Sequence, residues 1–482
     1  LFMRQREESV AGGLFWKLLE LLGAQGIQFV VALLLARLMT PAEYGTIGLI
    51  MIFITLANVF VQSGFATALI QAERVEEADF SSVFWISLAV SVPVYGLLVL
   101  AAPFIAAYYE TPVLQPLLTA MGLVLFPGAV ISVQTAYVAR NLQFRKLFEA
   151  TMVAVILSGA VAIVMAQRGY GVFAMAAQQL VYHVALMLGL FVAVSFRPRG
   201  GIALNRVERL FSFGWKILLS GLLDTLWNNL YGLLIGKYYS KTALGGYNRA
   251  EQFPKLITSN LSAAMQSVLL PTYARHQGEK ESLRELLSRS LRLSAFVIFP
   301  MMAGMAAVGT SLIRTLLTED WLFSVPYLRI LCLCYAFWPL HVSNLQMVTA
   351  LGRSDWFLKL ECMKKLLGAV LLALSLRYGM MGLLVFKAVD EALCTALNAY
   401  PVGKLLGYGP LTQYRELAPA ALSSILMGIA VYRMEGLPLR APLLLLTQLV
   451  AGMLLYGIFS LVFQRDTLGE LRDFIRTRRE KA

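Results

Sequence analysis

Residues 80–106 read FSSVFWISLAVSVPVYGLLVLAAPFIA and contain no charged side chain. A run of about 20 mostly apolar residues is long enough to cross the hydrocarbon core of a bilayer as a helix. This stretch therefore predicts a transmembrane helix.

Similar apolar stretches fill almost the whole chain, and the connectors between them are short. Their number predicts about 14 membrane helices, with no room for a soluble domain between them. The predicted spans are residues 14–36, 45–69, 80–106, 114–136, 147–166, 171–195, 211–236, 254–271, 292–317, 326–350, 358–377, 379–402, 416–434 and 441–463.

The composition agrees with this interpretation. Of the 482 residues, 58% are hydrophobic and 14% are charged, whereas soluble domains are about 45–50% apolar and about 25% charged. These values exclude a disordered chain, collagen, a coiled coil and a set of soluble domains. The sequence predicts an all-α, polytopic membrane protein. The four cysteines lie inside apolar runs, so we expect buried thiols rather than disulfides or metal ligands.

The net charge of +13 would indicate nucleic-acid binding in a soluble protein. In a membrane protein, it first reflects the Lys and Arg residues that gather in cytoplasmic loops. When the N-terminus is placed in the cytoplasm, Lys and Arg in the inner segments outnumber those in the outer segments by more than two to one. We therefore expect both termini to be cytoplasmic and expect no nucleic-acid partner.

Short sequences recur between the two halves of the chain. WKLL at residues 16–19 recurs as WKIL at 215–218, and RLMT at 37–40 is matched by KYYS at 237–240. This places spans 1–6 against spans 7–12 in the same orientation, a parallel repeat found in secondary transporters. The predicted divisions are a six-helix lobe at 1–200, a second six-helix lobe at 201–405, two extra helices at 406–464 and a cytoplasmic tail at 465–482.

Two segments have the pattern of amphipathic helices on the inner membrane surface. Residues 272–291 carry leucines at helical spacing among Glu and Arg, and the tail carries apolar residues among arginines. A plain solvated helix is an equally good interpretation of the tail.

Ionisable residues inside membrane spans usually line cavities or pair with one another, because exposing them to lipid is costly. Lys387, Asp390 and Glu391 lie near the middle of span 12, at spacings that allow all three to meet on one helix face. Two carboxylates and one amine leave one acid unmatched. We predict an ion-coupling site here, with H⁺ or Na⁺ as the ion. The alternative is a buried ion pair between helices.

Span 7 carries Lys216, Ser220, Asp224 and Asn228 at fourfold spacing, which predicts a polar stripe along one side of a helix. We expect this stripe to line a substrate cavity. The alternative is hydrogen bonding between helices.

Span 1 repeats the stripe more weakly, with Lys17, Glu20 and Gln28 on one face. Lys17 recurs as Lys216 in the second half, so we expect both amines at a shared substrate cleft. The alternative for Lys17 is a side chain that reaches to the membrane interface.

Two further cations are candidate substrate contacts. Lys364 lies near the cytoplasmic end of span 11, and Arg249 lies near the outer end of span 8. The alternatives for Lys364 are contact with headgroups or a side chain that reaches to the membrane interface, and those for Arg249 are contact with a headgroup or capping of a helix end. The membrane histidines His183 and His341 are interpreted as packed side chains.

Motifs of known enzymes are absent from the sequence. It contains no G-x-S-x-G, no H-E-x-x-H and no P-loop. We therefore expect no enzymatic activity, no cofactor, no metal and no ATP coupling. The longest outer connector, about residues 237–253, is too short for the catalytic domain of a polysaccharide polymerase or ligase.

Three local sequences together resemble the polysaccharide transporter family of the MOP superfamily, the O-antigen and exopolysaccharide flippases. They are ARLMTPAEYG at residues 36–45, GFATALIQ at 64–71 and GYNRAEQFP at 246–254. We interpret these motifs as structural turns rather than as chemistry.

The resemblance implies two six-helix lobes around a central cavity. It also implies a monomeric flippase in the bacterial cytoplasmic membrane that moves undecaprenyl-pyrophosphate-linked oligosaccharide from the inner to the outer leaflet by alternating access. Lys17, Lys216, Lys364 and Arg249 are then candidate pyrophosphate contacts. By analogy with the related lipid II flippases, the two extra helices form a groove for the lipid tail.

Other functions remain open at this point. A lipid II flippase is related, but that family is marked by several arginines in its first helices, and span 1 has Lys17 as its only cation before Arg37. A multidrug antiporter of the same superfamily favours an acidic, aromatic pocket. An assembly protein without transport activity is a further alternative.

Overall fold

The computed structural model of the chain describes residues 2–62, 65–71, 75–199, 204–470 and 472. Some side chains within these ranges lie outside the description, namely those of residues 2–11, 13–14, 67, 71, 204–214, 216, 354 and 358. Helices make up nearly all of the described backbone, and these ranges contain no strand. The predicted all-α fold class is confirmed.

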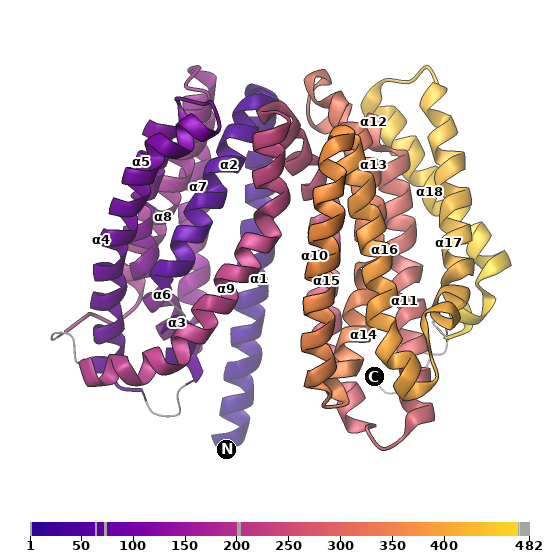
Figure 1. The fold of residues 1–482 in the computed structure, drawn as a ribbon, viewed down its shortest axis with the longest axis horizontal. Helices are drawn as coiled ribbons and strands as arrows, with labels where there is room; N and C mark the ends of the chain where they lie inside the picture. Colours follow the sequence, from indigo (N-terminus) through magenta and orange to yellow (C-terminus); the bar gives the residue numbers. More distant parts are fainter. Residues whose placement is uncertain (1, 63–64, 72–74, 200–203, 471, 473–482) are drawn as a thin grey trace. The chain divides into compact units, whose positions relative to one another are not determined.

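The chain divides into two compact units, residues 1–245 and residues 246–482. Helices of unit 1 are coloured indigo to magenta in Figure 1. They are α1 (Phe2–Leu38), α2 (Pro41–Gln62), α3 (Phe65–Gln71), α4 (Glu77–Tyr108), α5 (Leu114–Gly122), α6 (Leu125–Arg140), α7 (Phe144–Gln167), α8 (Val172–Ala193) and α9 (Leu204–Tyr238).

Unit 2 contains the remaining helices, and the first residues of α10 still belong to unit 1. The longer helices are α10 (Lys241–Arg275), α11 (Lys280–Ala307), α12 (Gly309–Leu316), α13 (Val325–Ala336), α14 (Trp338–Ala350), α15 (Ser354–Ser375), α16 (Gly379–Leu406), α17 (Pro410–Arg433) and α18 (Ala441–Phe463). Short 3-10 helices occur at η1 (Glu319–Ser324), η2 (Leu376–Tyr378) and η3 (Met434–Gly436).

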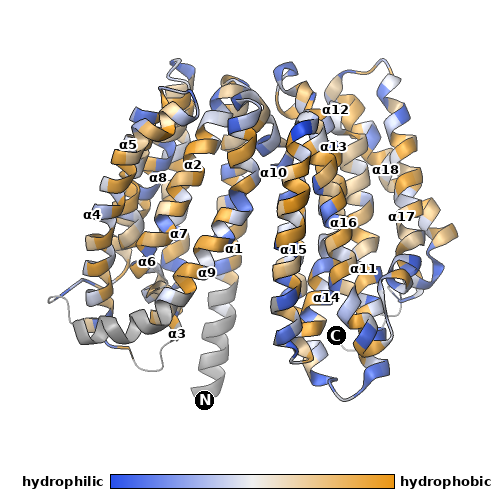
Figure 2. Ribbon diagram, in the orientation of Figure 1, coloured by the Kyte–Doolittle hydropathy of each residue, from blue (hydrophilic) through white to orange (hydrophobic). Residues whose placement is uncertain are grey.

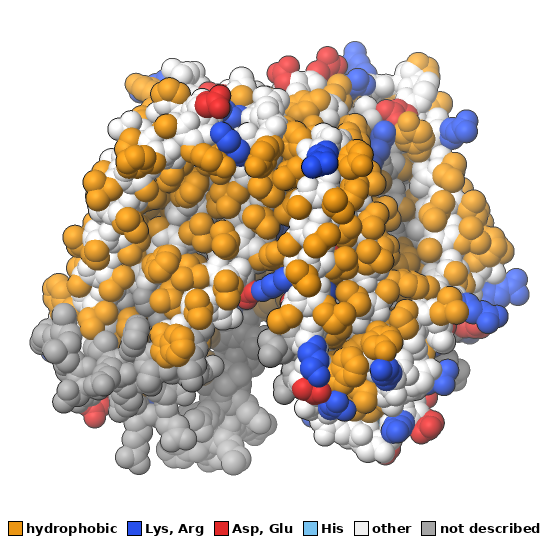
Figure 3. Space-filling view, in the orientation of Figure 1, with side chains coloured by type: hydrophobic (Ala, Val, Ile, Leu, Met, Phe, Trp, Pro, Cys, Tyr) orange, Lys and Arg blue, Asp and Glu red, His pale blue; other side chains and the backbone are white. Residues whose placement is uncertain are grey.

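The helices are long and apolar enough to cross a membrane. Eleven candidate spans are found among the described residues, and one of them, Asp355–Leu406, contains both α15 and α16. The helices α9 and α10 occupy the remaining two predicted spans. The described helices are therefore consistent with the predicted fourteen. Within each unit, hydrophobic residues cover the middle of the helices, and charged side chains lie mainly towards the helix ends (Figures 2 and 3).

Two predicted spans are interrupted at corresponding places in the repeat. Span 4 is divided into α5 and α6 at Leu123 and Val124, and span 10 is divided into α13 and α14 at Phe337. Interrupted helices at matching positions are typical of transporters with internal repeats, where they build substrate and ion sites. The break between α13 and α14 therefore marks a candidate site for substrate or ion binding in unit 2.

In unit 1, small residues allow helices to approach closely. A Cβ added to Gly189 of α8 would lie 3.0 Å from the Cβ of Ala150 in α7, and one added to Gly159 of α7 would lie 2.6 Å from Val31 in α1. Small residues at helix crossings are common in membrane proteins. Because lipid is as apolar as the helix surfaces, no hydrophobic effect drives the helices together, and they associate through close van der Waals packing. The helices α1, α7 and α8 thus form one layer of unit 1.

A pair of glycines brings α2 into contact with the first turn of α10. A Cβ on Gly45 would lie 1.8 Å from the carbonyl oxygen of Lys241, and a Cβ on Gly245 would lie 2.0 Å from the carbonyl oxygen of Pro41. The two contacts mirror each other, since each glycine meets the residue four positions before its counterpart. This symmetry agrees with the predicted parallel repeat.

The structure corrects two expectations about connectors. Residues 241–253 were expected in an outer connector, but α10 begins at Lys241 and continues to Arg275. Residues 272–291 were expected on the membrane surface, but Leu283, Leu287 and Leu291 are fully buried in the core of unit 2. The leucine stripe faces α14 and α17 rather than lipid, because the apolar face of a helix packs equally well against other helices.

Candidate functional site

Polar and charged side chains gather on one helix of unit 2. In α16, Lys387, Asp390 and Glu391 are partly buried, and Thr395 and Asn398 are buried one and two turns further along. Buried charges require partners, because removing them from water is costly. Each of these side chains has a partner on its own helix or a neighbouring one.

Lys387 lies against α10 and α13. Its Nζ is 3.7 Å from Oε1 of Glu251 and donates to the Tyr247 hydroxyl at 3.2 Å. The Tyr247 hydroxyl donates in turn to Glu251 at 2.8 Å, and Tyr335 of α13 also interacts with Glu251. The result is a compact group of one amine, one carboxylate and two phenols inside the helix bundle.

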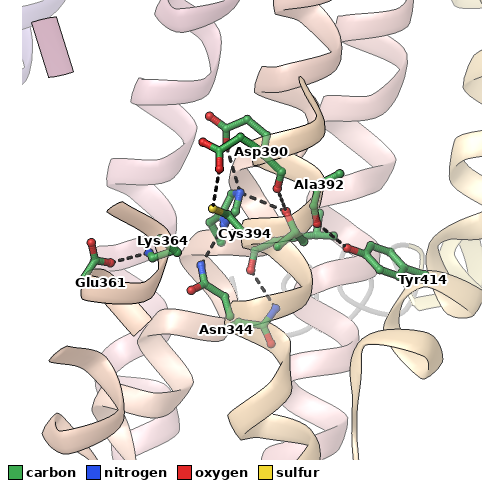
Figure 4. Close-up of polar contacts among 12 residues, drawn as sticks. Asn344, Glu361, Lys364, Asp390, Ala392, Cys394 and Tyr414 are labelled. Atoms are coloured by element: carbon green, nitrogen blue, oxygen red, sulfur yellow. Dashed lines mark hydrogen bonds and ion pairs between the residues drawn. The ribbon is translucent and has the colours of Figure 1, made fainter. Parts of the chain in front are cut away.

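Glu391 lies against α14. Its Oε2 is 3.3 Å from Nε2 of His341. The same imidazole contacts Thr395 at 3.1 Å through Nε2 and Asn398 at 2.9 Å through Nδ1. Figure 4 shows this region, where side chains from α14, α15, α16 and α17 converge.

Two further contacts complete the network. Asp390 accepts a hydrogen bond from the thiol of Cys394 at 3.5 Å. Lys364 of α15 pairs with Glu361 one turn away at 2.5 Å and lies close enough to Glu391 for its charge to act on that carboxylate. Figure 4 shows Asp390 with Cys394 and Lys364 with Glu361.

Sequence reasoning identified part of this network. It placed Lys387, Asp390 and Glu391 on one helix face, and the structure brings all three to the buried polar region. It does not predict Glu251 and Tyr247, because the polar residues of their segment favour an outer connector. The fourfold spacing of Tyr247 and Glu251 in a segment next to an apolar run was the available signal.

His341 was also missed, since a single histidine in an apolar span was interpreted as a packed side chain. The structure shows it in contact with Glu391, Thr395 and Asn398. The lone histidine had no distinguishing pattern in the sequence. Its partners lie on another helix, about 50 residues away along the chain.

In unit 1, Lys17 pairs with Glu20 at 2.5 Å along α1. The Lys17 side chain is 41% exposed, whereas that of Glu20 is 14% exposed. Gln28 is exposed on the same helix. The side chain of Lys216, the predicted counterpart of Lys17, lies outside the described residues.

The predicted stripe on α9 is an exposed face of that helix. Ser220, Asp224 and Asn228 are all exposed. Polar side chains along a membrane helix are expected to face water or a polar ligand rather than lipid. This placement is compatible with the predicted cavity-lining role.

Arg249 differs from the expectation for an outer helix end. It is 5% exposed and donates a hydrogen bond to Gln252 of the same helix. The side chain is therefore buried in the described structure rather than presented at a helix end.

The described residues contain no group of three or more His, Cys, Asp or Glu side chains arranged to hold a metal ion. Cys332, Cys334 and Cys394 are free and buried, as expected. Cys362 was also expected to be buried, but it is exposed on α15.

An apolar cavity of about 380 Å³ lies in unit 2 where α11 and α12 meet α17 and α18. Met301, Met305, Met427 and Met453 contribute flexible thioether side chains to its wall, and Gly452 leaves room in α18. Methionine adapts to irregular apolar ligands. This cavity includes the two helices that lie outside the sequence repeat.

Comparisons with known proteins place the chain in a family. Over 98% of its length it is similar, at 24% identity, to the succinoglycan biosynthesis transport protein ExoT of Rhizobium meliloti (strain 1021), of which 97% is covered.

Solved structures show the same fold. The inward closed form of the lipid II flippase MurJ matches with a TM-score of 0.74 at 16% identity, covering 94% of this chain and all of the other. An inward-facing multidrug resistance MATE transporter of the MOP superfamily matches with a TM-score of 0.58 at 14% identity, covering 82% of this chain and 94% of the other. Both structures are described as transporters or flippases rather than as enzymes.

Residues 34–326, more than half of the chain, match the family described as "Polysaccharide biosynthesis protein". The motifs at residues 36–45, 64–71 and 246–254 all lie inside the matched region. The chain therefore belongs to this family of polysaccharide biosynthesis proteins.

Proposed function

We propose that this protein is a flippase that moves undecaprenyl-pyrophosphate-linked oligosaccharide from the inner to the outer leaflet by alternating access. The observation that carries the proposal is the nearly full-length match to a polysaccharide transport protein, in a chain with the fold of a lipid flippase. The parallel repeat and the interrupted helices fit a transporter.

The substrate has three chemically different parts, which are the pyrophosphate, the sugars and the isoprenoid tail. A pyrophosphate requires cations, which we assign to Lys17, Lys216, Lys364 and Arg249. Glu20, Gln28, Asp224 and Asn228 offer hydrogen bonds to sugar hydroxyls. In the described structure Lys17 is paired with Glu20, so the pyrophosphate would take the place of that carboxylate.

The isoprenoid tail requires an apolar surface that is accessible from the membrane. We assign it to the cavity between α11, α12, α17 and α18, because its wall is almost entirely apolar and rich in methionine. This assignment gives the two extra helices a role that the repeat does not supply.

Transport against a gradient requires an energy source. We assign ion coupling to Lys387, Asp390 and Glu391, with H⁺ or Na⁺ as the ion. Their burial in the middle of a membrane helix supports this role, since charged groups in this position usually mark ion pathways.

We further propose that the protein is a monomer of the bacterial cytoplasmic membrane with both termini in the cytoplasm. The distribution of Lys and Arg supports this orientation. Reporter fusions after Gly201 and Gln464 should give a cytoplasmic signal, and a fusion after Lys241 should give an exterior signal. An exterior signal after Gly201 contradicts the fourteen-span topology.

Complementation of a polysaccharide-export defect tests the cation assignment. Lys17→Gln and Lys216→Gln each remove a charge-assisted contact, which is worth roughly 1.5–3 kcal/mol, so export should fall about tenfold or more while the protein still inserts. Lys→Arg at either position should retain partial export. Normal export by the double Gln variant, at equal expression, removes both lysines from the site.

Lipid II is the second candidate substrate, favoured by the fold match to MurJ. The family and the full-length relative favour an exported polysaccharide instead. Rescue of a strain depleted of its lipid II flippase, without rescue of a polysaccharide-export mutant, favours lipid II.

A further inference from the structure

The hydrogen bonds around His341 determine which of its nitrogens carries a proton. The Thr395 hydroxyl donates to the backbone carbonyl of Glu391 at 2.8 Å, so its oxygen is left to accept a hydrogen bond from Nε2 of His341 at 3.1 Å. Nε2 therefore carries hydrogen, and it also lies 3.3 Å from the Glu391 carboxylate. The assignment follows from the network, as histidine tautomers generally must.

The other nitrogen, Nδ1, carries no hydrogen and can accept a proton on its lone pair. The Nδ2 amide group of Asn398 lies 2.9 Å from Nδ1 and can only donate to it. The imidazole is thus neutral in this arrangement. Asn398 is 1% exposed, and among the described residues its Oδ1 has no hydrogen-bond partner. Turning this amide would bring Oδ1 to Nδ1, where it would accept a hydrogen bond from a protonated ring.

The surroundings of the imidazole favour an added positive charge. The carboxylates of Asp390 and Glu391 both lie close enough to interact with the ring, and no titratable side chain occurs at 293–307 of α11 or elsewhere on α14. The titratable and charged groups nearby are Glu251 on α10, Cys334 and Tyr335 on α13, Glu361 and Lys364 on α15, Lys387, Asp390, Glu391 and Cys394 on α16, and Tyr414 on α17.

The position of His341 in the fold allows its protonation to act on the helices. It lies in the first turn of α14, directly after the interruption at Phe337. Its partners Glu391, Thr395 and Asn398 lie on α16. A change in these contacts therefore alters how the free end of an interrupted helix is held to its neighbour.

We propose that His341 is the proton-binding residue of this transporter, taking the coupling proton on Nδ1 while Glu391 holds the Nε2 hydrogen and Asn398 turns its amide oxygen to the new N–H. The proposal rests on the flippase function and adds His341 and Asn398 to the ion-coupling residues. The proton arrives from water, forms the Nδ1–H bond with the ring's lone pair and leaves again to water on the other side of the membrane. No electron is transferred.

The donor groups in this site favour a proton over a sodium ion. His341 Nε2–H and the Asn398 amide N–H are both hydrogen-bond donors in this site, whereas Na⁺ requires oxygen ligands like other hard cations. Histidine is also the side chain whose charge ordinarily changes near neutral pH. A proton is therefore the ion that this arrangement accepts with a turn of the Asn398 amide alone.

Histidine NMR on the whole protein in nanodiscs tests the proton site directly, because the chain contains three histidines. The resonances of His341 are assigned with His341→Gln. As the pH is lowered, we expect His341 to change from the Nε2–H tautomer to the doubly protonated ring. Asn398→Asp supplies a permanent acceptor at Nδ1 and should keep the ring protonated at higher pH than in the wild type. A ring that stays neutral throughout, or one that Asn398→Asp does not affect, overturns the proposal.

A flipping assay connects the site to transport. Proteoliposomes receive a fluorescently labelled polyprenyl-pyrophosphate oligosaccharide, and flipping is measured with and without a pH difference. The pH difference should accelerate flipping by the wild type severalfold, and His341→Gln should remove this acceleration. The matched control His183→Gln changes a histidine of α8 that contacts the Gln179 carbonyl, and it should keep the acceleration.

The two assays separate failure of the inference from failure of the proposed function. If His341→Gln flips lipid and keeps the acceleration, or if only a Na⁺ gradient accelerates the wild type, the proton site is wrong while the flippase function stands. If the wild type takes up the proton at Nδ1 but moves no labelled lipid, the flippase function is wrong while the proton-binding role of His341 stands.

Discussion

The ion pair between Lys387 and Glu251 provides the sharpest test of the buried network in unit 2. Replacing Lys387 with Met keeps most of the side-chain volume and removes the amine. Glu251 then remains between helices with the Tyr247 hydroxyl but without its cation. We expect Lys387→Met to destabilise the protein strongly, and Glu251→Gln to do the same from the other side of the pair.

The magnitude follows from the geometry of the pair. The two charged atoms are 3.7 Å apart, and the side chains are 15% and 18% exposed. At an effective dielectric constant near 20, charges about this far apart attract by about 4 kcal/mol. Removing one partner of a buried pair costs about 3–5 kcal/mol, so each single variant should lose about 3 kcal/mol. The double variant should lose less than the sum, with a coupling energy of about 2 kcal/mol.

Thermal unfolding in detergent can measure these losses through the free thiols. Cys332, Cys334 and Cys394 are buried and react with a fluorogenic maleimide on unfolding, and the exposed Cys362 is replaced by Ala. For a unit the size of unit 2, a loss of 3 kcal/mol lowers the Tm by roughly 6–12 °C.

Tyr247→Phe is the matched control for the ion pair. It removes the hydroxyl that bridges the pair and leaves both charges, so it should cost about 1 kcal/mol. If the effects of Lys387→Met and Glu251→Gln simply add in the double variant, the two groups do not interact and the described network is refuted.

Two further predictions concern glycines, each with a matched control. Gly452→Phe fills the apolar cavity beside α18 and should reduce polysaccharide export about tenfold, equivalent to roughly 1.4 kcal/mol of lost tail binding. Gly457→Phe, on the exposed side of α18, should leave export unchanged, and equal export by both variants would show that the cavity does not bind the lipid tail. Gly45→Ala places a Cβ 1.8 Å from the carbonyl oxygen of Lys241 and should lower the free energy of unfolding by about 1–3 kcal/mol. Gly96→Ala, whose Cβ would have no atom within 4 Å, should be neutral or slightly stabilising, and an unchanged Tm of Gly45→Ala contradicts the close contact of α2 with the first turn of α10.

Membrane spans could be predicted from the sequence because hydropathy is a local property. Among the described residues, each of the fourteen predicted spans is occupied largely by helix, and the stretch at 80–106 lies entirely inside α4. The errors occurred where polar residues continue a helix. Residues 241–253 carry Lys, Arg and Glu, yet they continue the helix α10, in which residues 243–247 are buried.

What an amphipathic helix face packs against could not be predicted in the same way. The leucines at 283, 287 and 291 form an apolar stripe that fits a membrane surface as well as a protein core. The structure buries them against α14 and α17. Periodicity identifies the stripe, but its partner depends on tertiary packing.

Charged residues in the candidate site were identified one helix at a time. Lys387, Asp390 and Glu391 stand out because charge is rare in a membrane span. Their partners Glu251 and His341 come from α10 and α14, and pairing across helices leaves no pattern in a single sequence. The predicted balance of two carboxylates and one amine in span 12 was therefore incomplete. It did not include the Glu251 carboxylate or the His341 imidazole, because these groups lie on other helices.

The central claim is that this protein moves a lipid-linked oligosaccharide across a bilayer, and a leaflet-protection assay measures this directly. The purified protein is placed in liposomes that contain polyprenyl-pyrophosphate oligosaccharide with a fluorescent label on the sugar, and a membrane-impermeant reductant is added outside. We expect the label of both leaflets to be reduced in time, and the Lys17→Gln, Lys216→Gln double variant to slow reduction of the inner-leaflet label. If the inner-leaflet label stays protected with wild-type protein as it does in empty liposomes, the protein is not a flippase for this class of lipid.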